Sequence, residues 1–241
     1  MEVVNIFFMA ITFKDKRFLV LGLGATGVSM ANYLISRGSF VALTDDHRPG
    51  FELQKILGNN SEAVLFDDKQ NGLEREVYDY LAISPGVPMT HPLVRRSQML
   101  GIPVLGDIEL FFNEKNKLKK SKLVGITGSN GKTTVTEMVG AICGFADVSC
   151  TLGGNIGKPV LDILGEIESG ATLEPEVLVL ELSSFQLDNS KSHALDVAVL
   201  LNITEDHLDR YDSFQKYVDS KISIFDRANK KVINQKDFSL H

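Results

Sequence analysis

A glycine-rich turn between an apolar stretch and a helical stretch constrains this chain more than any other feature. Residues 123–126 are typical of a short buried strand, and residues 135–141 can open a helix. The turn between them is Gly128-Ser129-Asn130-Gly131-Lys132-Thr133-Thr134. In such a turn the backbone N–H groups and the helix dipole attract phosphates, a lysine adds a mobile positive charge and a threonine hydroxyl can bind Mg²⁺. The sequence therefore predicts a triphosphate site, with Lys132 and Thr133 in the last two roles.

One departure from the standard P-loop pattern leaves an alternative open. The first glycine of that pattern would fall at position 126, which is isoleucine. A chance Gly-Lys-Thr sequence in a surface loop is the competing interpretation. The strand before the turn and the helix after it favour the phosphate site.

The composition restricts the class of protein. With 241 residues the chain can form one large domain or two ordinary ones. Its 44% hydrophobic and 23% charged residues are typical of a soluble globular protein. The net charge of −6 argues against a general nucleic-acid binder and against a protein that binds anionic membranes.

Cysteine usage and the start of the chain bear on its location. Cys143 and Cys150 have no ligand-like neighbours in the sequence and predict free thiols in a reducing compartment. Residues 1–11 are apolar but short, and they lack the basic start of a signal peptide. No other stretch approaches a membrane span. We therefore expect a cytoplasmic protein without a membrane partner.

Apolar runs alternate with helical stretches along the first part of the chain. Strands are expected at residues 17–21, 40–44, 63–66, 80–83 and 103–105, and helices at residues 28–37, 51–57 and 92–100. This alternation predicts an α/β fold with a Rossmann-like parallel sheet that is covered on both faces.

The polar, lysine-rich stretch 113–122 predicts a domain boundary, with residues 1–112 in a first domain and residues 113–241 in a second. The second is expected to be a P-loop ATPase-like α/β domain. Its expected strands are residues 123–126, 176–180, 197–201 and 231–234. No closing element follows the last of these strands, so this domain is expected to be truncated.

A second glycine-rich turn, Gly22-x-Gly24-x-x-Gly27, follows the first expected strand. It matches the dinucleotide fingerprint, and Asp45 or Asp46 lies where a ribose-binding acid is expected. Three interpretations stay open: an NAD site, a site for another diphosphate-containing ligand, and a tight turn that binds nothing. The turn Ser84-Pro85-Gly86 follows another strand at the same sheet edge, where ligands of α/β sheets bind.

Polar residues also follow the strands of the second domain. Glu181 lies at a strand tip, where it can hold Mg²⁺ or be a solvated strand end. Residues 202–209 include three carboxylates and His207, and a helix cap by Thr204 explains part of this pattern. His207 by itself is compatible with a surface histidine or with a metal ligand. Asn155, in a glycine-rich loop, can contact a substrate.

Several motifs resemble those of the Mur ligases. They are residues 126–134, 153–157, 181–187 and 202–211, in the family's order. The P-loop of that family shows the same missing glycine. Residues 22–27, 84–86 and 106–111 resemble the branch of the family that adds D-glutamate, and the resemblance extends from about residue 11 to residue 234.

The resemblance implies an ATP-dependent, amide-forming ligase of peptidoglycan synthesis. ATP would phosphorylate the terminal carboxylate of UDP-N-acetylmuramoyl-L-alanine, and the amine of D-glutamate would attack the acyl phosphate. By the same resemblance, Lys132 and the P-loop amides hold the phosphates. Thr133 and Glu181 hold one Mg²⁺. His207 serves a second metal together with Lys221, which matches a family lysine that carries a carbamate; spacing alone would equally allow an exposed helix lysine.

The resemblance also implies which residues contact the substrate. At the uridine diphosphate site they are Ala25, Thr26, Asp46, Ser84, Pro85 and Gly86, and near the P-loop they are Asn155, Ser183 and Gln186. Asp46 and His47 differ from the residues expected at the family's uracil site.

The family has a third, C-terminal domain and further central strands that this sequence lacks. We therefore expect the front half of such an enzyme, a monomer that does not form the amide bond by itself. Two other functions stay open, a nucleotide-binding fragment without catalysis and an NAD-dependent oxidoreductase. Nucleotide binding without turnover would favour the former, and reduction of added NAD would favour the latter.

Overall fold

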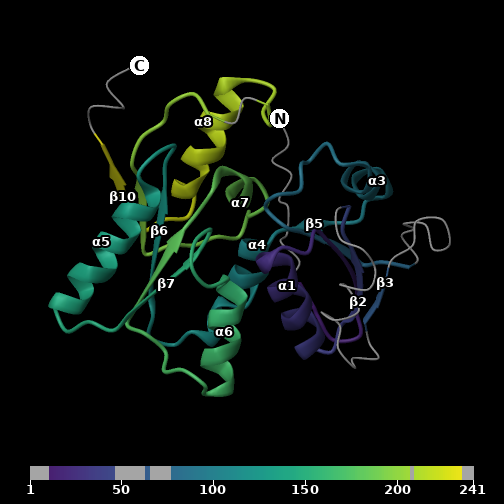
Figure 1. Cartoon of the computed structure of the whole chain (residues 1–241), viewed down its shortest axis with the longest axis horizontal. Helices are drawn as coiled ribbons and strands as arrows, with labels where there is room; N and C mark the ends of the chain where they lie inside the picture. The colour runs from purple at the N-terminus through teal and green to yellow at the C-terminus, as the bar shows by residue number, and fades with distance from the viewer. Residues whose placement is uncertain (1–10, 47–62, 66–76, 207–208, 235–241) are drawn as a thin grey trace, which may run out of the picture.

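The first part of the chain forms a five-stranded parallel sheet (Figure 1). The computed structural model describes residues 11–46, 63–65, 77–206 and 209–234. The strands are β1 (Arg17–Leu21), β2 (Phe40–Thr44), β3 (Ala63–Leu65), β4 (Tyr80–Ile83) and β5 (Val104–Leu105). Their order is β3-β2-β1-β4-β5. From β1 the chain adds β2 and β3 on one side of the sheet and then β4 and β5 on the other, so the strand order reverses between β1 and β4. Doubly wound sheets bind ligands at such a reversal.

Helices cover both faces of this sheet, as the sequence predicts. The helices of this part are α1 (Ala25–Ser36), α3 (Pro92–Leu100) and α4 (Asp107–Asn113). Because side chains alternate along a strand, Phe18 of β1 packs in the same buried cluster as Met30 of α1. The next residue, Leu19, packs in the cluster that contains Val94 of α3. The α/β fold class is therefore confirmed.

The second part of the chain forms another five-stranded parallel sheet, in the order β10-β9-β6-β8-β7. Its strands are β6 (Lys122–Thr127), β7 (Cys150–Gly154), β8 (Val177–Glu181), β9 (Val197–Leu200) and β10 (Lys230–Ile233). Its helices are α5 (Lys132–Phe145), α6 (Val160–Ser169), α7 (Ser184–Asp188) and α8 (Phe214–Ile222). Strand β6 lies at the centre, so the turn that follows it opens between the ends of β8 and β9.

Two helices begin earlier than the sequence predicts. Helix α1 begins at Ala25 and not at residue 28, and α5 begins at Lys132. The residue before each helix is a glycine, Gly24 or Gly131, that supplies no side-chain cap. Each helix therefore starts within its glycine-rich turn, and its first N–H groups face outward at the turn.

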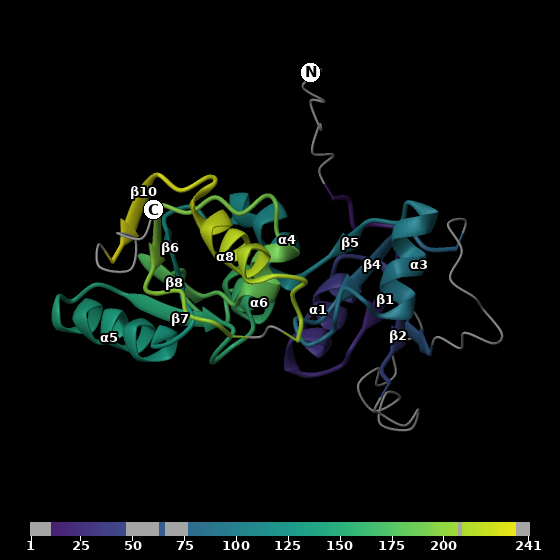
Figure 2. The ribbon, with the colours of Figure 1, turned by 90° about the horizontal axis from the view of Figure 1, so that it is seen from above.

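The two sheets lie side by side and are joined through their helices (Figure 2). A single buried cluster contains residues of both parts. Ion pairs also link the two parts: Lys117 lies 2.8 Å from both Glu114 and Glu168, and Arg37, which follows α1, pairs with Glu168 of α6. The expected boundary at residue 113 thus falls within a network that links the two parts. The division into domains at that position stays a proposal.

The structure also bears on the expected helix cap, the cysteines and the absence of a membrane span. The helix cap by Thr204 is wrong, because no helix starts there and α8 is capped by Ser213. Cys143 and Cys150 are free thiols. The expected helix at residues 51–57 and the strand residue Phe66 lie outside the described residues. Within the described part of the chain, no helix has both the length and the apolar character needed to cross a membrane.

Candidate functional site

The turn after β1 uses its three glycines for different purposes. Gly22 has a φ of +83°, which strongly favours glycine. A Cβ atom on Gly27 would lie 1.9 Å from the Gly22 carbonyl oxygen, so this position has no room for a side chain. Gly24 has an ordinary backbone conformation, and a Cβ atom on it would meet no other atom within 4 Å. Packing therefore requires Gly22 and Gly27, whereas Gly24 leaves open space in front of the turn.

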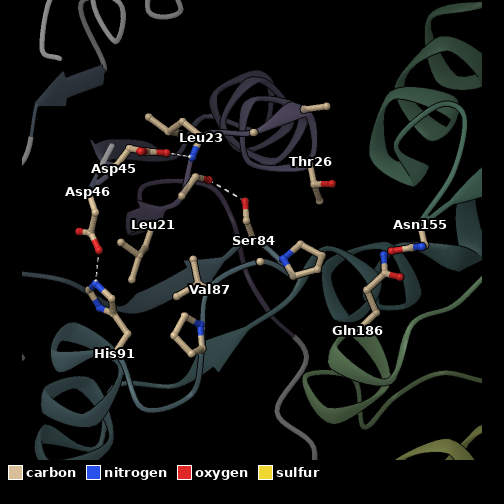
Figure 3. Close-up of a pocket in the computed structure, with 16 residues that line it drawn as sticks. Leu21, Leu23, Thr26, Asp45, Asp46, Ser84, Val87, His91, Asn155 and Gln186 are labelled. Atoms are coloured by element: carbon tan, nitrogen blue, oxygen red, sulfur yellow. Dashed lines mark hydrogen bonds and ion pairs between the residues drawn. The ribbon is translucent and has the colours of Figure 1, made fainter. Parts of the chain in front are cut away.

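A pocket of about 400 Å³ lies over the carboxyl ends of β1 and β4, at the reversal point of the first sheet (Figure 3). Most of the residues predicted to contact the substrate line it, namely Ala25, Thr26, Asp46, Ser84, Pro85, Gly86, Asn155 and Gln186. Ser183 is not among its lining residues. The pocket therefore brings together predicted residues from both parts of the chain. Their contact with a substrate remains a prediction.

The start of α1 places N–H groups without acceptors in the helix at this pocket. The first N–H groups of the helix, including those of Ala25 and Thr26, have no acceptor within the helix, and Gly24 supplies no side-chain cap. The Ser84 hydroxyl donates to the Gly22 carbonyl over 2.6 Å and joins the two turns. No lysine or arginine is among the described residues that line the pocket. Phosphate bound here would therefore be held by amides and the helix dipole.

The two acids at the end of β2 have different surroundings. Asp45 accepts the N–H of Leu23 over 2.6 Å and so braces the glycine turn. Asp46 lies 3.0 Å from Nε2 of His91, the residue before α3. In Figure 3 Asp46 and His91 lie at one end of the pocket, and Asn155 and Gln186 lie at the other.

Asn202, which follows β9, holds the first half of the P-loop. The N–H of Ser129 donates to the Asn202 carbonyl over 3.0 Å, and the N–H of Asn130 donates to its side-chain oxygen over 2.9 Å. These two amides are therefore engaged within the protein. The N–H groups at the start of α5, from Lys132 to Thr134, have no acceptor within the helix. The N–H groups around the helix start are therefore available to a phosphate, and the binding of ATP by residues 128–134 stays a prediction.

Two lysines share one carbonyl oxygen of the P-loop. Lys132 and Lys221 each donate to the Gly128 carbonyl over 2.8 Å, and Lys132 also donates to that of Ser129. Lys221 is only 2% exposed, so the interpretation as an exposed helix lysine is wrong. Burial, with a further contribution from the positive charge of Lys132, lowers the pKa of Lys221 to about 8.

Glu181 connects the P-loop to the pocket. One of its carboxylate oxygens accepts from the Thr133 hydroxyl and the other from the Asn155 amide, both over 2.9 Å. Glu181 is 1% exposed, which excludes the interpretation as a solvated strand end. Among the described residues it forms no ion pair. A buried carboxylate beside a hydroxyl, without a counter-charge, has the oxygen ligands that suit Mg²⁺.

Ser183 and Gln186 form a capping box at the start of α7. The Gln186 side chain accepts from the Ser183 N–H over 3.1 Å and donates to Asp107 of α4 over 3.0 Å. Asp107 is buried, and its other oxygen has no hydrogen-bond partner among the described residues. Burial raises the pKa of Asp107 to about 6. These bonds hold the Gln186 side chain in one position at the pocket wall.

The sequence pattern missed several residues that organise these sites. Tyr217 of α8 lies 2.9 Å from the Ser129 hydroxyl, which also donates to the Thr204 carbonyl. A tyrosine within a helix carries no sequence signal for such a contact, whereas Asn202 begins the polar motif at residues 202–209. No group of three possible metal-binding side chains occurs among the described residues, which do not include His207.

A doubly wound parallel sheet joined to a second parallel sheet with a P-loop defines this chain as a P-loop α/β protein. Two family models match it: the Mur ligase MurD-like N-terminal domain over residues 16–106, and the Mur ligase middle domain over residues 126–240. The chain belongs to the Mur ligase family.

Curated relatives agree with this assignment. The UDP-N-acetylmuramoylalanine–D-glutamate ligase of Nitrosospira multiformis is 43% identical over 228 residues, which cover 93% of this chain and 48% of the relative. That of Thiobacillus denitrificans is 37% identical over 239 residues, which cover 95% and 50%. The chain thus spans about half the length of the curated relatives it matches.

The fold is also that of a solved structure, the UDP-N-acetylmuramate:L-alanyl-gamma-D-glutamyl-meso-diaminopimelate ligase from Neisseria meningitides. The TM-score is 0.54 at 18% identity, with 94% of this chain and 73% of that chain covered. This likeness concerns the architecture alone.

Proposed function

We propose that this chain binds UDP-N-acetylmuramoyl-L-alanine in the pocket and Mg·ATP at the P-loop, as the N-terminal and middle domains of a D-glutamate-adding ligase. One observation carries the proposal: Glu181 is hydrogen-bonded both to Thr133 of the P-loop and to Asn155 of the pocket. A ligand that extends through the pocket toward Asn155 therefore approaches the place where the terminal phosphate of ATP would lie.

The proposed reaction activates a carboxylate in two steps. An oxygen of the substrate carboxylate attacks the γ-phosphorus of ATP, and the bond to ADP breaks. The amine of D-glutamate then attacks the acyl carbon and loses a proton, and inorganic phosphate leaves. Positioning and charge neutralisation supply most of the catalysis in phosphoryl transfer. Lys132 and the N–H groups at the start of α5 would perform this role for the phosphates.

The residues around Glu181 fit a magnesium ion. Thr133 and Glu181 would be the ligands, and the ion would neutralise phosphate charge. This buried carboxylate has hydrogen bonds but no cation among the described residues. The proposed location is the cytoplasm, where free thiols such as Cys143 and Cys150 stay reduced, and the proposed state is a monomer.

The pocket should prefer a uridine nucleotide to a nicotinamide dinucleotide. We expect calorimetric titration to show binding of UDP and of UDP-N-acetylmuramoyl-L-alanine, and no measurable binding of NAD. The longer ligand should bind more tightly because it also reaches Asn155 and Gln186 at the far end of the pocket. Affinity for NAD without affinity for either uridine nucleotide would contradict the assignment.

We further propose that Lys221 carries a carbamate and so supplies an anionic oxygen ligand to a second metal, together with His207. A carbamate forms when a neutral amine attacks carbon dioxide and loses a proton. A lysine with an ordinary pKa is almost entirely protonated at neutral pH. The lowered pKa of Lys221 makes the neutral amine available there.

The carbamate predicts a pH-dependent NMR signal. With ¹³C-labelled bicarbonate, the protein should show a carbamate resonance whose intensity, at constant dissolved carbon dioxide, rises with pH from about 6.5 until Lys221 is fully converted. It rises because the neutral amine becomes more abundant as pH approaches the pKa of Lys221, and because forming the carbamate releases a proton. Lys221→Ala should remove the resonance. Lys216→Ala, on the exposed side of the same helix, should keep it. A resonance that persists in folded Lys221→Ala would assign it to another group.

A further inference from the structure

His91 joins the start of α3 to the end of β2 across one end of the pocket. Its Nδ1 accepts the N–H of Leu93 over 3.2 Å, which caps the helix. A nitrogen that accepts a hydrogen bond carries no proton, so the proton of the neutral ring is on Nε2. Nε2 therefore donates to the Asp46 carboxylate, 3.0 Å away.

The bond from His91 changes what Asp46 can do. The Asp46 side chain is 58% exposed, whereas that of His91 is 12% exposed and held by its bond to α3. A carboxylate on an exposed side chain samples several rotamers, and binding a ligand then costs the entropy of ordering it. His91 holds one carboxylate oxygen in advance. The other oxygen accepts no hydrogen bond among the described residues, and Asp46 is one of the residues that line the pocket.

The position of Asp46 indicates which part of a ligand it meets. The glycine turn and the start of α1, which suit a diphosphate, lie in the middle of the pocket wall, and Asn155 and Gln186 lie at the opposite end from Asp46 (Figure 3). A nucleotide–sugar whose sugar points toward Asn155 places its nucleoside at Asp46. The donors of a uridine nucleoside are the imide N–H of the base and the ribose hydroxyls.

We propose that His91 is a positioning residue for nucleoside recognition: it holds Asp46 so that the free carboxylate oxygen accepts a hydrogen bond from a donor of the nucleoside. This inference rests on the proposed function of the pocket. His91 itself does not contact the reacting atoms. Its effect is confined to ligands that carry a nucleoside.

The variant His91→Asn separates the two roles of His91. Asparagine caps helices well, so it can still accept the N–H of Leu93, but it has no donor at the position of Nε2. In calorimetric titrations of the whole chain, we expect His91→Asn to weaken UDP binding about tenfold, because Asp46 is no longer held in advance and its side chain must be ordered when the ligand binds. Binding of inorganic pyrophosphate, which needs only the glycine turn and α1, should not change.

A double-mutant comparison tests whether His91 acts through Asp46. Asp46→Asn should weaken UDP binding at least as much as His91→Asn, and the double variant should be no weaker than Asp46→Asn alone. Two analogues identify the donor. N3-methyl-UDP lacks the imide N–H and 2′-deoxy-UDP lacks one hydroxyl; the analogue without the contacted donor should bind equally to wild type and to His91→Asn.

Several results would overturn the inference. Unchanged UDP affinity in His91→Asn would do so, as would additive losses in the double variant or an equal loss of pyrophosphate and UDP. A wild type that binds no UDP would overturn the proposed function as well, which distinguishes the two failures. If His91→Asn does not fold, ¹⁵N NMR of the His91 ring in the wild type decides. A proton on Nδ1 in place of Nε2 would contradict the geometry.

Discussion

Replacing Lys132 with alanine should weaken the binding of Mg·ATP by at least about 100-fold, equivalent to about 2.7 kcal/mol. Lys132 stands at the first position of α5, and its ammonium group reaches the carbonyls of Gly128 and Ser129. The ammonium group therefore lies at the P-loop. Because the lysine side chain is flexible, it can turn from these carbonyls to the β- and γ-phosphates of bound ATP. Lys221 cannot replace it, because Lys221 is buried and its ammonium group is held by the Gly128 carbonyl. Isothermal titration calorimetry measures the loss.

A matched control separates the loss of this charge from a general effect. Lys158→Ala removes a lysine of the same part of the chain that pairs with Glu166 at the surface. It should leave the dissociation constant of Mg·ATP unchanged. Thermal unfolding should show that both variants stay folded. An unchanged dissociation constant in Lys132→Ala, beside a wild type that binds Mg·ATP, would show that this loop is not the phosphate site.

Replacing Gly27 with alanine should lower the free energy of unfolding by about 3 kcal/mol or more, because a methyl group must displace packed backbone. A Cβ atom there would lie 1.9 Å from the Gly22 carbonyl oxygen and 2.7 Å from the Ser84 hydroxyl. The Gly22 carbonyl is backbone and cannot move without opening the contact between α1 and its turn, and the Ser84 hydroxyl can turn away only by breaking its hydrogen bond to Gly22. Chemical denaturation of the variant and the wild type measures the difference. A stability equal to that of the wild type would contradict the close packing.

Gly24 provides the opposite case on the same turn. A side chain at Gly24 would enter open space, and the backbone conformation there suits any residue. Gly24→Val should therefore keep nearly the wild-type stability and lose most of the UDP affinity, since the new side chain occupies the approach to the turn. Normal UDP binding by Gly24→Val would place the diphosphate elsewhere.

The fold was largely predictable because its signals are local. Buried parallel strands are continuous apolar runs, and residues 17–21, 40–44 and 80–83 form strands at the predicted positions. Helix starts were less accurate. The glycine before α1 lacks the side-chain cap that usually marks a helix N-terminus, so the helix was predicted to start at residue 28.

The candidate site was predictable where its conformation depends on residues that are close together in the sequence, as in a glycine-rich turn. Gly22 and Gly27 have the spacing of a phosphate-binding turn. In the structure Gly22 has a positive φ, and Gly27 has no room for a side chain. The expected helix cap by Thr204 is wrong because the surroundings of Thr204 do not depend on its neighbours in the sequence. Its N–H donates to Ser129, far away in the sequence, so its environment is tertiary.

By itself, the sequence determined the α/β class, the two glycine-rich turns and the resemblance to the Mur ligases, because strand patterns and turns depend on neighbours along the chain. Only the tertiary structure decided that Lys221 is buried against the Gly128 carbonyl, that Glu181 joins Thr133 to Asn155, and that His91 holds Asp46. Each of these contacts joins residues that are more than 20 positions apart. The burial and the charged neighbours of such residues depend on which strands lie side by side in the sheet. No local sequence pattern specifies that strand order.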